Sequence, residues 1–417
     1  MSAPSADDVR TGLQTWLQHE WDPELSLRDW RERLADSGWG CPSWPKQWYG
    51  RGLSVGLASV VEDEFRTSKI VGTPSGSGMG LVAPTILEHG SDDVKRRFLR
   101  PIVTGDHQWC QLFSEPGNGS DLAGLSTQAE RDGDTWVING QKVWNTSAHH
   151  ADWGILLART NWDAPKHRGI TYFIIDMHQP GIEVRPLKQM NGHASFNEVF
   201  FDDARVPVEN TIGDVGNGWA VALATLAHER RLASTRRPGG ATKGGRAWRE
   251  ADAEAAEINK PYIWYPQRAG RPDLLIERAQ AAGLNHDPVI RQAIAQVVCL
   301  TRTAEWTAQR AVAARRLGRP PGPEGSLGKL HTSLIARACA RAHGSIAGAH
   351  ATLTHSDGPM DGLITEILIS VPAQSIAGGT DEIQHNILAE RVLGLPKEPS
   401  DDVAKPFRDV PRNIRRN

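Results

Sequence analysis

The sequence predicts an α+β chain in which a helical region comes first, a region of antiparallel strands second and another helical region last. Apolar residues recur at helical spacing up to about residue 108 and again from residue 216. Between these limits, short apolar runs are separated by Gly, Pro and Asp without intervening helices, which is typical of an antiparallel barrel or sandwich. We therefore expect domains at residues 1–108, 109–215 and 216–417.

In the first region, local signals delimit one helix closely. Ser91 is a good N-cap, two aspartates follow it, and Gly105 is placed to end a helix that runs to about Thr104. A glycine-rich stretch at 76–80 resembles a phosphate-binding loop, but no strand precedes it. We expect this stretch to allow close helix packing instead.

The middle region contains two apolar runs, at 136–138 and 142–144, separated by Asn139-Gly140. Because Asn-Gly tolerates the positive φ angles of a tight turn, these runs predict a β-hairpin. Further strand-like runs lie at 154–158, 169–176, 181–185 and 197–202. Just upstream, residues 114–121 read S-E-P-G-N-G-S-D, a loop of small polar residues. Composition alone leaves two interpretations, a loop that contacts a cofactor or an ordinary surface loop.

The last region has helical spacing at 219–235, 289–316, 327–347 and 378–393. Neither His149 nor His150 has a partner at metal-ligand spacing, so no metal site is expected.

Composition limits the possible functions. The net charge of −2 implies no basic face for nucleic acid. Four scattered cysteines without a C-x-x-C pair argue against a disulfide framework or a zinc site and favour a reducing cytoplasm. The first residues lack the features of a signal peptide, and no apolar run approaches the length of a membrane span.

Two long motifs then carry a family resemblance. The segments F-S-E-P-G-N-G-S-D (113–121) and D-G-D-T-W-V-I-N-G-Q-K-V-W (132–144) resemble one signature of the flavin-dependent acyl-CoA dehydrogenases. The segment I-A-G-G-T-D-E-I-Q (376–384), followed by A-E-R-V-L-G (389–394), resembles a second. The resemblance covers nearly the whole chain. It implies FAD as the cofactor, an acyl-CoA substrate, an electron-transfer flavoprotein as the electron acceptor, and a homo-oligomer or a hetero-oligomer with a paralogue.

The resemblance also assigns residues position by position. It implies that the substrate is contacted by Gly119, Ser120, Arg230 and Gly379. Arg291 matches an arginine that reaches the FAD of a neighbouring subunit, although its usual aromatic companion is Ile294 here. The residues that it implies for FAD binding are Gln111, Leu112, Ser114, Trp144, Thr146, Arg291, Thr380 and Glu382.

Dehydrogenation of an acyl thioester needs a base for the α proton, an acceptor for the β hydride, and donors for the thioester oxygen. Most family members carry the base in the second signature as E-G-T, where this chain has Gly378-Gly379-Thr380. A minority carries it in an E-R pair on an earlier helix, which Glu229-Arg230 matches here. Arg230 could keep Glu229 ionised. The alternative is that Glu229 is a helix-surface residue in a salt bridge.

The resemblance thus implies an enzyme that oxidises an acyl-CoA to the 2,3-enoyl-CoA with Glu229 as the base. The glycine at 378 suggests that the acyl group is branched or bulky. Two alternatives stay open. One is a flavin oxidase of the same fold, and the other is a non-catalytic subunit of a mixed assembly.

One segment departs from the family pattern. Residues 237–288 are charged and carry an aromatic patch at 262–265, where close relatives have a shorter glycine-rich link. The segment is either a tolerated surface insertion or a lid or partner contact. The tail from Lys397 mixes proline and charge, and we expect it to be poorly ordered.

Overall fold

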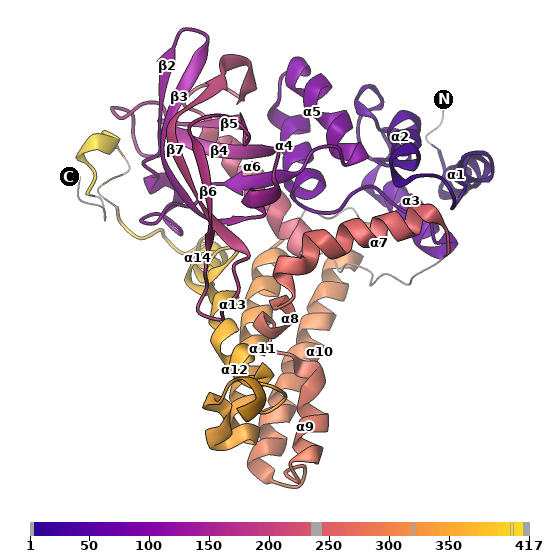
Figure 1. The fold of residues 1–417 in the computed structure, drawn as a ribbon, viewed down its shortest axis with the longest axis vertical. Coiled ribbons are helices and arrows are strands. Elements are labelled where there is room, and N and C mark those ends of the chain that lie inside the picture. The colour runs from indigo at the N-terminus through magenta and orange to yellow at the C-terminus, as the bar shows by residue number, and fades with distance from the viewer. Residues whose placement is uncertain are drawn as a thin grey trace. The chain divides into compact units, whose positions relative to one another are not determined.

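The computed structural model describes residues 4–234, 244–317, 319, 322–400, 402 and 404–411, without the side chains of 230–234, 315, 316 and 324. The chain divides into two compact units (Figure 1). The αβ unit comprises Met1–Leu187, Ser195–Asn259 and Ser400–Asn417. The helical unit comprises Lys188–Ala194 and Lys260–Pro399. The domain limits expected from the sequence stay predictions.

The αβ unit begins with α1 (Ala6–Glu20), α2 (Leu27–Ser37), α3 (Val55–Ser68), α4 (Ala83–His89) and α5 (Asp92–Thr104). The limits of α5 are those expected from its caps: the Ser91 side chain accepts from the Val94 amide at 3.3 Å, and Gly105 ends the helix at φ +84°. Residues 78–82 form a wide helical turn that leads into α4. A Cβ on Gly78 would lie 3.2 Å from Trp109, so glycine does serve close packing here.

The middle of the chain forms one eight-stranded sheet, which confirms the predicted fold class. The strand order is β6-β7-β3-β2-β4-β5-β8, with β1 also paired to β4. All pairings are antiparallel except β1 and β2 against β4. The strands are β1 (Trp109–Leu112), β2 (Gln128–Asp132), β3 (Thr135–Thr146), β4 (Trp153–Arg159), β5 (Ile170–Asp176), β6 (Ile182–Leu187), β7 (Phe196–Pro207) and β8 (Thr211–Ile212).

The predicted hairpin at Asn139-Gly140 is wrong. Residues 135–146 form one continuous strand, and Asn139-Gly140 lies at a register shift in its pairing with β7. The tight turn falls at Asp132–Thr135 instead, where Gly133 has a φ of +58° and connects β2 to β3. Asp132–Thr135 and Asn139-Gly140 both carry turn-forming residues. The chain turns at the first of them because β3 pairs with the long strand β7 across the second.

The next helix, α6 (Gly218–Ser234), lies against the sheet and α4. Its first residue crosses β5 closely, since a Cβ on Gly218 would lie 2.6 Å from the Thr171 backbone. Apolar side chains of α4, α5 and α6 pack with those of β4 and β5 in one buried cluster. The α6 helix is therefore fixed to the sheet on which the site is built.

The inserted segment is largely helical in its described part, residues 244–288. Its first part, α7 (Arg246–Asn259), packs on the N-terminal helices. There Arg31 pairs with Glu254 at 2.7 Å, and the Trp248 indole donates to the Lys69 carbonyl at 2.9 Å. Its second part, α8 (Tyr265–Arg268) and α9 (Leu275–Ala281), belongs to the helical unit. The aromatic patch is only partly exposed, because Trp264 is 1% exposed.

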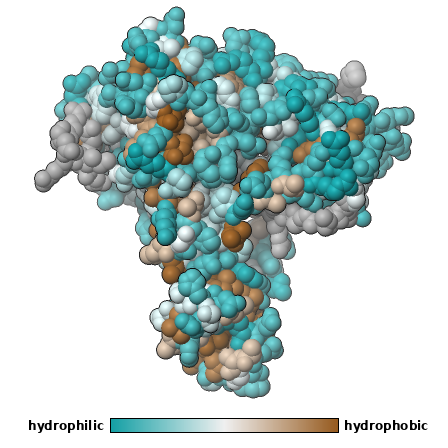
Figure 2. Space-filling view, viewed as in Figure 1, coloured by the Kyte–Doolittle hydropathy of each residue, from teal (hydrophilic) through white to brown (hydrophobic). Residues whose placement is uncertain are grey.

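The helical unit is built on two long helices, α10 (Pro288–Arg316) and α11 (Glu324–Ala347). Three shorter helices, α12 (Leu363–Ser370), α13 (Pro372–Ile376) and α14 (Asp381–Arg391), pack against α11. The link between β6 and β7 folds with this unit, since His193 lies 2.9 Å from Glu366 and Asn191 donates to Ser370 at 3.1 Å. Figure 2 shows apolar residues, in brown, exposed along this unit.

The tail was expected to be poorly ordered, but residues 404–411 pack against the rest of the αβ unit. Phe407 is fully buried and Val410 is 6% exposed, both against the αβ unit. Within the described ranges, no helix is long and apolar enough to cross a membrane.

Candidate functional site

Strand β1 brings the first two expected cofactor residues to the sheet. Its side chains alternate, so Cys110 and Leu112 are fully buried while Gln111 is half-buried on the other face. The Gln111 amide donates to the Glu229 carboxylate over 3.4 Å. The structure thus brings together two predicted site residues that are far apart in the sequence. Leu112 packs into the core of the sheet, so a ligand could reach only its backbone.

The loop after β1 is held by a buried ion pair that the sequence interpretation missed. Lys142 on β3 donates to the Glu115 carboxylate at 2.9 Å and to the Phe113 carbonyl at 3.0 Å. Glu115 also accepts from the backbone amides of Ser126 at 2.6 Å and Thr127 at 2.8 Å. These contacts tie both ends of the loop to the strand. The available signal was Lys142 at the start of the otherwise apolar run 142–144.

Both members of this pair are nearly inaccessible, at 0% and 4% side-chain exposure. Burial alone raises the pKa of Glu115, but Lys142 and the two loop amides outweigh it and hold that pKa below its usual 4.5. Burial lowers the pKa of Lys142 despite the nearby carboxylate. Removing either partner would therefore leave an uncompensated charge in the core.

The end of β3 presents Trp144 in an unusual conformation. Its backbone has a φ of +63°, it lies at a register shift between Val143 and Asn145, and its side chain is 56% exposed. The residues on either side are tied down: the Val143 amide donates to the Ser114 carbonyl at 2.9 Å, and the Asn145 side chain donates to the Gln111 carbonyl at 2.8 Å. Such strained positions cluster at functional sites.

The end of β3 and the loop after β1 have the features that an FAD ring system needs. An exposed indole between two hydrogen-bonded residues, beside half-buried Ser114 and Thr146, suits the packing of a planar aromatic ring. The strand end and the loop would contact the ring together, because the Ser114 carbonyl accepts a hydrogen bond from the Val143 amide, next to Trp144.

Glu229 lies on the last part of α6, and a buried hydroxyl cluster one turn earlier sets the position of that helix. Thr225 lies 2.9 Å from the Thr85 hydroxyl and 3.1 Å from the Tyr172 hydroxyl, which joins α6 to α4 and β5. Burial raises the pKa of Tyr172, so its hydroxyl stays protonated. Glu229 itself is half-buried. The neighbouring Arg230 side chain lies outside the described residues.

Gly119 and Ser120 are exposed at the tip of the loop. The next residue, Asp121, accepts from the Lys166 ammonium at 2.6 Å. Arg159, fully buried, donates to the carbonyls of Ala123 at 2.7 Å and Leu125 at 3.2 Å. The tip is therefore open to a ligand, while the backbone behind it is fixed.

In the helical unit, the second signature forms the start of α14. Thr380 is the N-cap, and its hydroxyl accepts from the Ile383 amide at 3.3 Å. Gly378 and Gly379 both have positive φ, of 69° and 85°. A Cβ on Gly379 would lie 2.6 Å from the side-chain nitrogen of Gln384, whereas a Cβ on Gly378 would meet nothing within 4 Å. Backbone and Thr380 hydrogen bonds lower the pKa of exposed Glu382.

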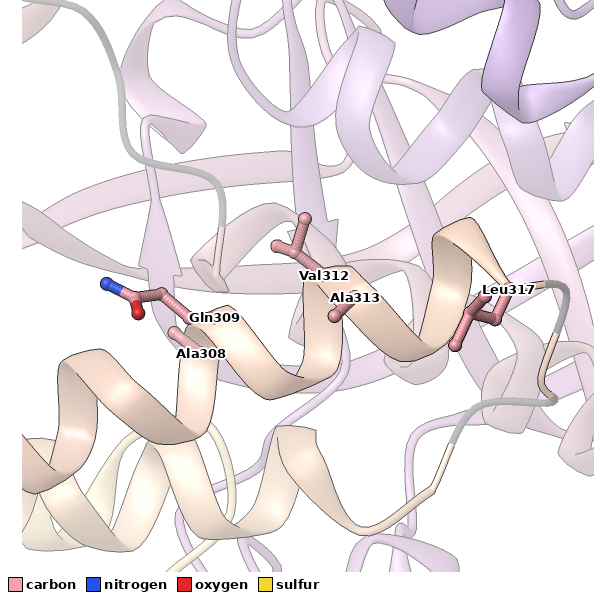
Figure 3. A pocket seen from close by; sticks show the side chains of 5 residues that line it. All are labelled: Ala308, Gln309, Val312, Ala313 and Leu317. Carbon is pink, nitrogen blue, oxygen red and sulfur yellow. The ribbon is translucent and has the colours of Figure 1, made fainter.

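Arg291 is exposed on the first turn of α10, where it donates to the Asn285 carbonyl at 3.3 Å. Ile294 packs partly against the core formed by α9, α10 and α11. None of the expected site residues lines the shallow apolar pocket on the later part of α10 (Figure 3). That pocket is lined by Ala308, Gln309, Val312, Ala313 and Leu317. Within the described ranges, no group of three or more His, Cys, Asp and Glu side chains could hold a metal ion.

Comparison with known proteins decides the family. Models of the acyl-CoA dehydrogenase N-terminal, middle and C-terminal domains match residues 6–106, 110–204 and 274–393. The chain belongs to the acyl-CoA dehydrogenase family. The chain is 36% identical over 377 residues to the acyl-CoA dehydrogenase IpdE1 of Mycobacterium tuberculosis, covering 89% of this chain and 88% of that protein. It is 37% identical to part of the acyl-CoA dehydrogenase FadE34 of the same organism, covering 87% of this chain and 46% of that protein.

Solved structures share the fold. The ChsE4–ChsE5 complex from Mycobacterium tuberculosis matches with a TM-score of 0.61 at 25% identity, covering 95% of this chain and 99% of the matched chain. The Tcur3481–Tcur3483 steroid acyl-CoA dehydrogenase matches with a TM-score of 0.65 at 22% identity, with the same coverage. The family implies an acyl-CoA substrate and FAD. The roles of individual site residues stay predictions.

Proposed function

We propose that this chain oxidises an acyl-CoA to the 2,3-enoyl-CoA, with Glu229 as the base. The observation that carries the proposal is the contact between the Glu229 carboxylate and Gln111, because it places the carboxylate beside the strand from which the cofactor loop starts. No carboxylate is available at 378, where the chain has glycine. In this proposal the Glu229 carboxylate accepts the α proton, and Gln111 and the α6 hydroxyl cluster keep that carboxylate in place.

FAD, when bound, supplies the acceptor for the β hydride. Trp144 and Thr146 would hold its ring system together with Ser114, since exposed Trp144 and half-buried Thr146 end β3 and half-buried Ser114 lies in the adjoining loop. Gln111, the Leu112 backbone, Thr380 and Glu382 complete the proposed contacts, with Arg291 reaching the cofactor of a second subunit. Gly119, Ser120, Arg230 and Gly379 are the proposed substrate contacts. We propose an electron-transfer flavoprotein as the electron acceptor and the cytoplasm as the compartment.

The acyl group proposed is branched or bulky. Gly378 supports this, because the space next to it is empty where an E-G-T enzyme carries a glutamate side chain. Anaerobic bleaching of the flavin by straight, branched and ring-bearing acyl-CoAs would rank these classes directly.

The test of the base is Glu229→Gln, which keeps the shape of the side chain but cannot accept the α proton. We expect flavin reduction by a reactive acyl-CoA to slow by about 10²–10⁴-fold with the FAD content unchanged. Glu229→Asp is the matched control, since it keeps a carboxylate and should retain part of the rate. Near-normal reduction by Glu229→Gln would show that the base lies elsewhere.

A second candidate is a partner subunit of a mixed assembly. It is favoured by the missing E-G-T glutamate, and the similar ChsE4–ChsE5 structure is itself a complex of two different chains. In that case the purified chain would bind FAD, and its flavin would be reduced by acyl-CoA, only after a paralogue is added.

A further inference from the structure

The C-terminal strap, which we define as residues 404–411, is paired with a loop of the αβ unit. The Phe407 amide donates to the Ala164 carbonyl at 3.0 Å, and the Arg408 amide donates to the Trp162 carbonyl at 3.0 Å. Pro406 also forms an isolated bridge with Pro165. The strap therefore lies along the loop between β4 and β5.

Phe407 covers a buried cation. The guanidinium carbon of Arg159 lies 3.3 Å from the centre of the Phe407 ring, and both residues are fully buried. The Trp162 ring lies 5.5 Å from that of Phe407 and 5.8 Å from the same guanidinium carbon. Cation–π attraction strengthens when both groups are removed from water, so Phe407 favours one fixed orientation of this guanidinium.

Arg159 in turn holds the backbone behind the loop tip. Its guanidinium donates to the Ala123 and Leu125 carbonyls, and its amide donates to the Thr127 carbonyl at 2.7 Å. A second connection runs through Lys166, which lies two residues after Ala164 and binds Asp121. Both connections end just after Gly119 and Ser120.

We propose that the strap is a positioning element for the acyl-CoA loop and that Phe407 is its principal positioning residue. The inference rests on the proposed function, because the substrate role of Gly119 and Ser120 comes from it. Phe407 acts through Arg159 and does not itself touch the substrate. Loss of its ring should loosen residues 119–127 and weaken binding of the coenzyme A portion, without changing the chemical step.

The experiment compares three holoenzyme variants with the wild type. Phe407→Ala removes the ring, and Phe407→Leu keeps apolar bulk without an aromatic face in case the alanine variant does not fold. Arg408→Ala is the matched control, because it removes the exposed pair with Asp163 but leaves the ring over Arg159. The readouts are hydrogen exchange of the amides at 119–127, the Kd of free coenzyme A, and the separate kcat and KM for a reactive acyl-CoA.

We expect both Phe407 variants to exchange faster at 119–127 and to show a Kd for coenzyme A and a KM raised about fivefold or more, a coupling within the usual range. The kcat and FAD content should stay at the wild-type level, and Arg408→Ala should behave as wild type. Unchanged exchange at 119–127 in Phe407→Leu would overturn the inference, as would a fall in kcat with KM unchanged. Failure of the wild type to bind coenzyme A contradicts the proposed function instead, while the exchange data still decide whether the strap holds the loop.

Discussion

At the scale of single residues, the buried pair of Glu115 and Lys142 fixes the geometry of the loop after β1. The Glu115 carboxylate, at the start of the loop, accepts from two backbone amides at its end. The Lys142 ammonium binds the same carboxylate and so attaches the loop to β3. Three donors surround the carboxylate, so the charged form is favoured strongly enough to overcome burial. Ser114 and Trp144 are placed by this pair.

The lowered pKa of Glu115 predicts a specific dependence of stability on pH. A carboxyl whose pKa is lower in the folded state contributes its full stability above its unfolded pKa, and that contribution is lost as the pH falls through the folded value. We expect the melting temperature of the wild type to fall more steeply below about pH 4.5 than that of Glu115→Gln/Lys142→Met, in which neither group titrates. Thermal unfolding from about pH 7 to about pH 3 tests this. Parallel profiles would show that the pair does not contribute.

The sequence could suggest candidate site residues but not how they meet. The resemblance pointed to Gln111 and Glu229, and their contact depends on how α6 crosses β5 at Gly218. The ion pair escaped prediction for a related reason. A charged residue in a motif is usually exposed, and only non-local packing buries Glu115 and Lys142 together.

At the scale of elements, local signals succeeded where no long-range partner competed with them. Ser91 and Gly105 delimit α5 because caps act within one turn of the helix. The hairpin expected at Asn139-Gly140 failed because β3 pairs with β7 along nearly its whole length, and a bulge absorbs the glycine. Gly140 is still needed there, since a Cβ would lie 2.6 Å from the Thr127 side chain.

The inserted segment carries a prediction at this scale. Because Trp264 is fully buried in the helical unit, the segment should be required for stability rather than tolerated as a surface loop. Trp264→Ala should lower the free energy of unfolding by about 3–5 kcal/mol, measured by denaturant unfolding. Ile263→Ala, at a neighbouring position that is 66% exposed, is the control and should change it little. Equal effects of the two substitutions would contradict this packing.

At the scale of the whole molecule, the helical unit has apolar surface that a second chain could cover. On α10, Trp306 is 60% exposed, and Leu317, just after this helix, is 72% exposed and lines the apolar pocket of Figure 3. Exposed aromatic residues of this kind are enriched at protein interfaces. They support the expected oligomer, homomeric or mixed.

We expect the FAD-loaded protein to sediment as a dimer or larger. Trp306→Glu should raise the subunit dissociation constant by about tenfold or more, since a buried aromatic anchor commonly contributes at least 2 kcal/mol. Val55→Glu places the same charge at an exposed apolar position of the αβ unit and serves as the control. A wild-type protein that sediments as a monomer with its full complement of FAD would contradict the prediction.

The strap also has a consequence for biosynthesis. Phe407 is synthesised 248 residues (407 − 159) after Arg159, and the helical unit lies between them in the chain. At ordinary rates of translation this interval lasts roughly 12–50 s. During that time the nascent sheet carries the Arg159 guanidinium without the Phe407 ring that covers it. The loop that follows Ser120 therefore gains its final support only after the helical unit has left the ribosome, so late-stage folding of the tail should tighten the binding of coenzyme A by the newly made chain.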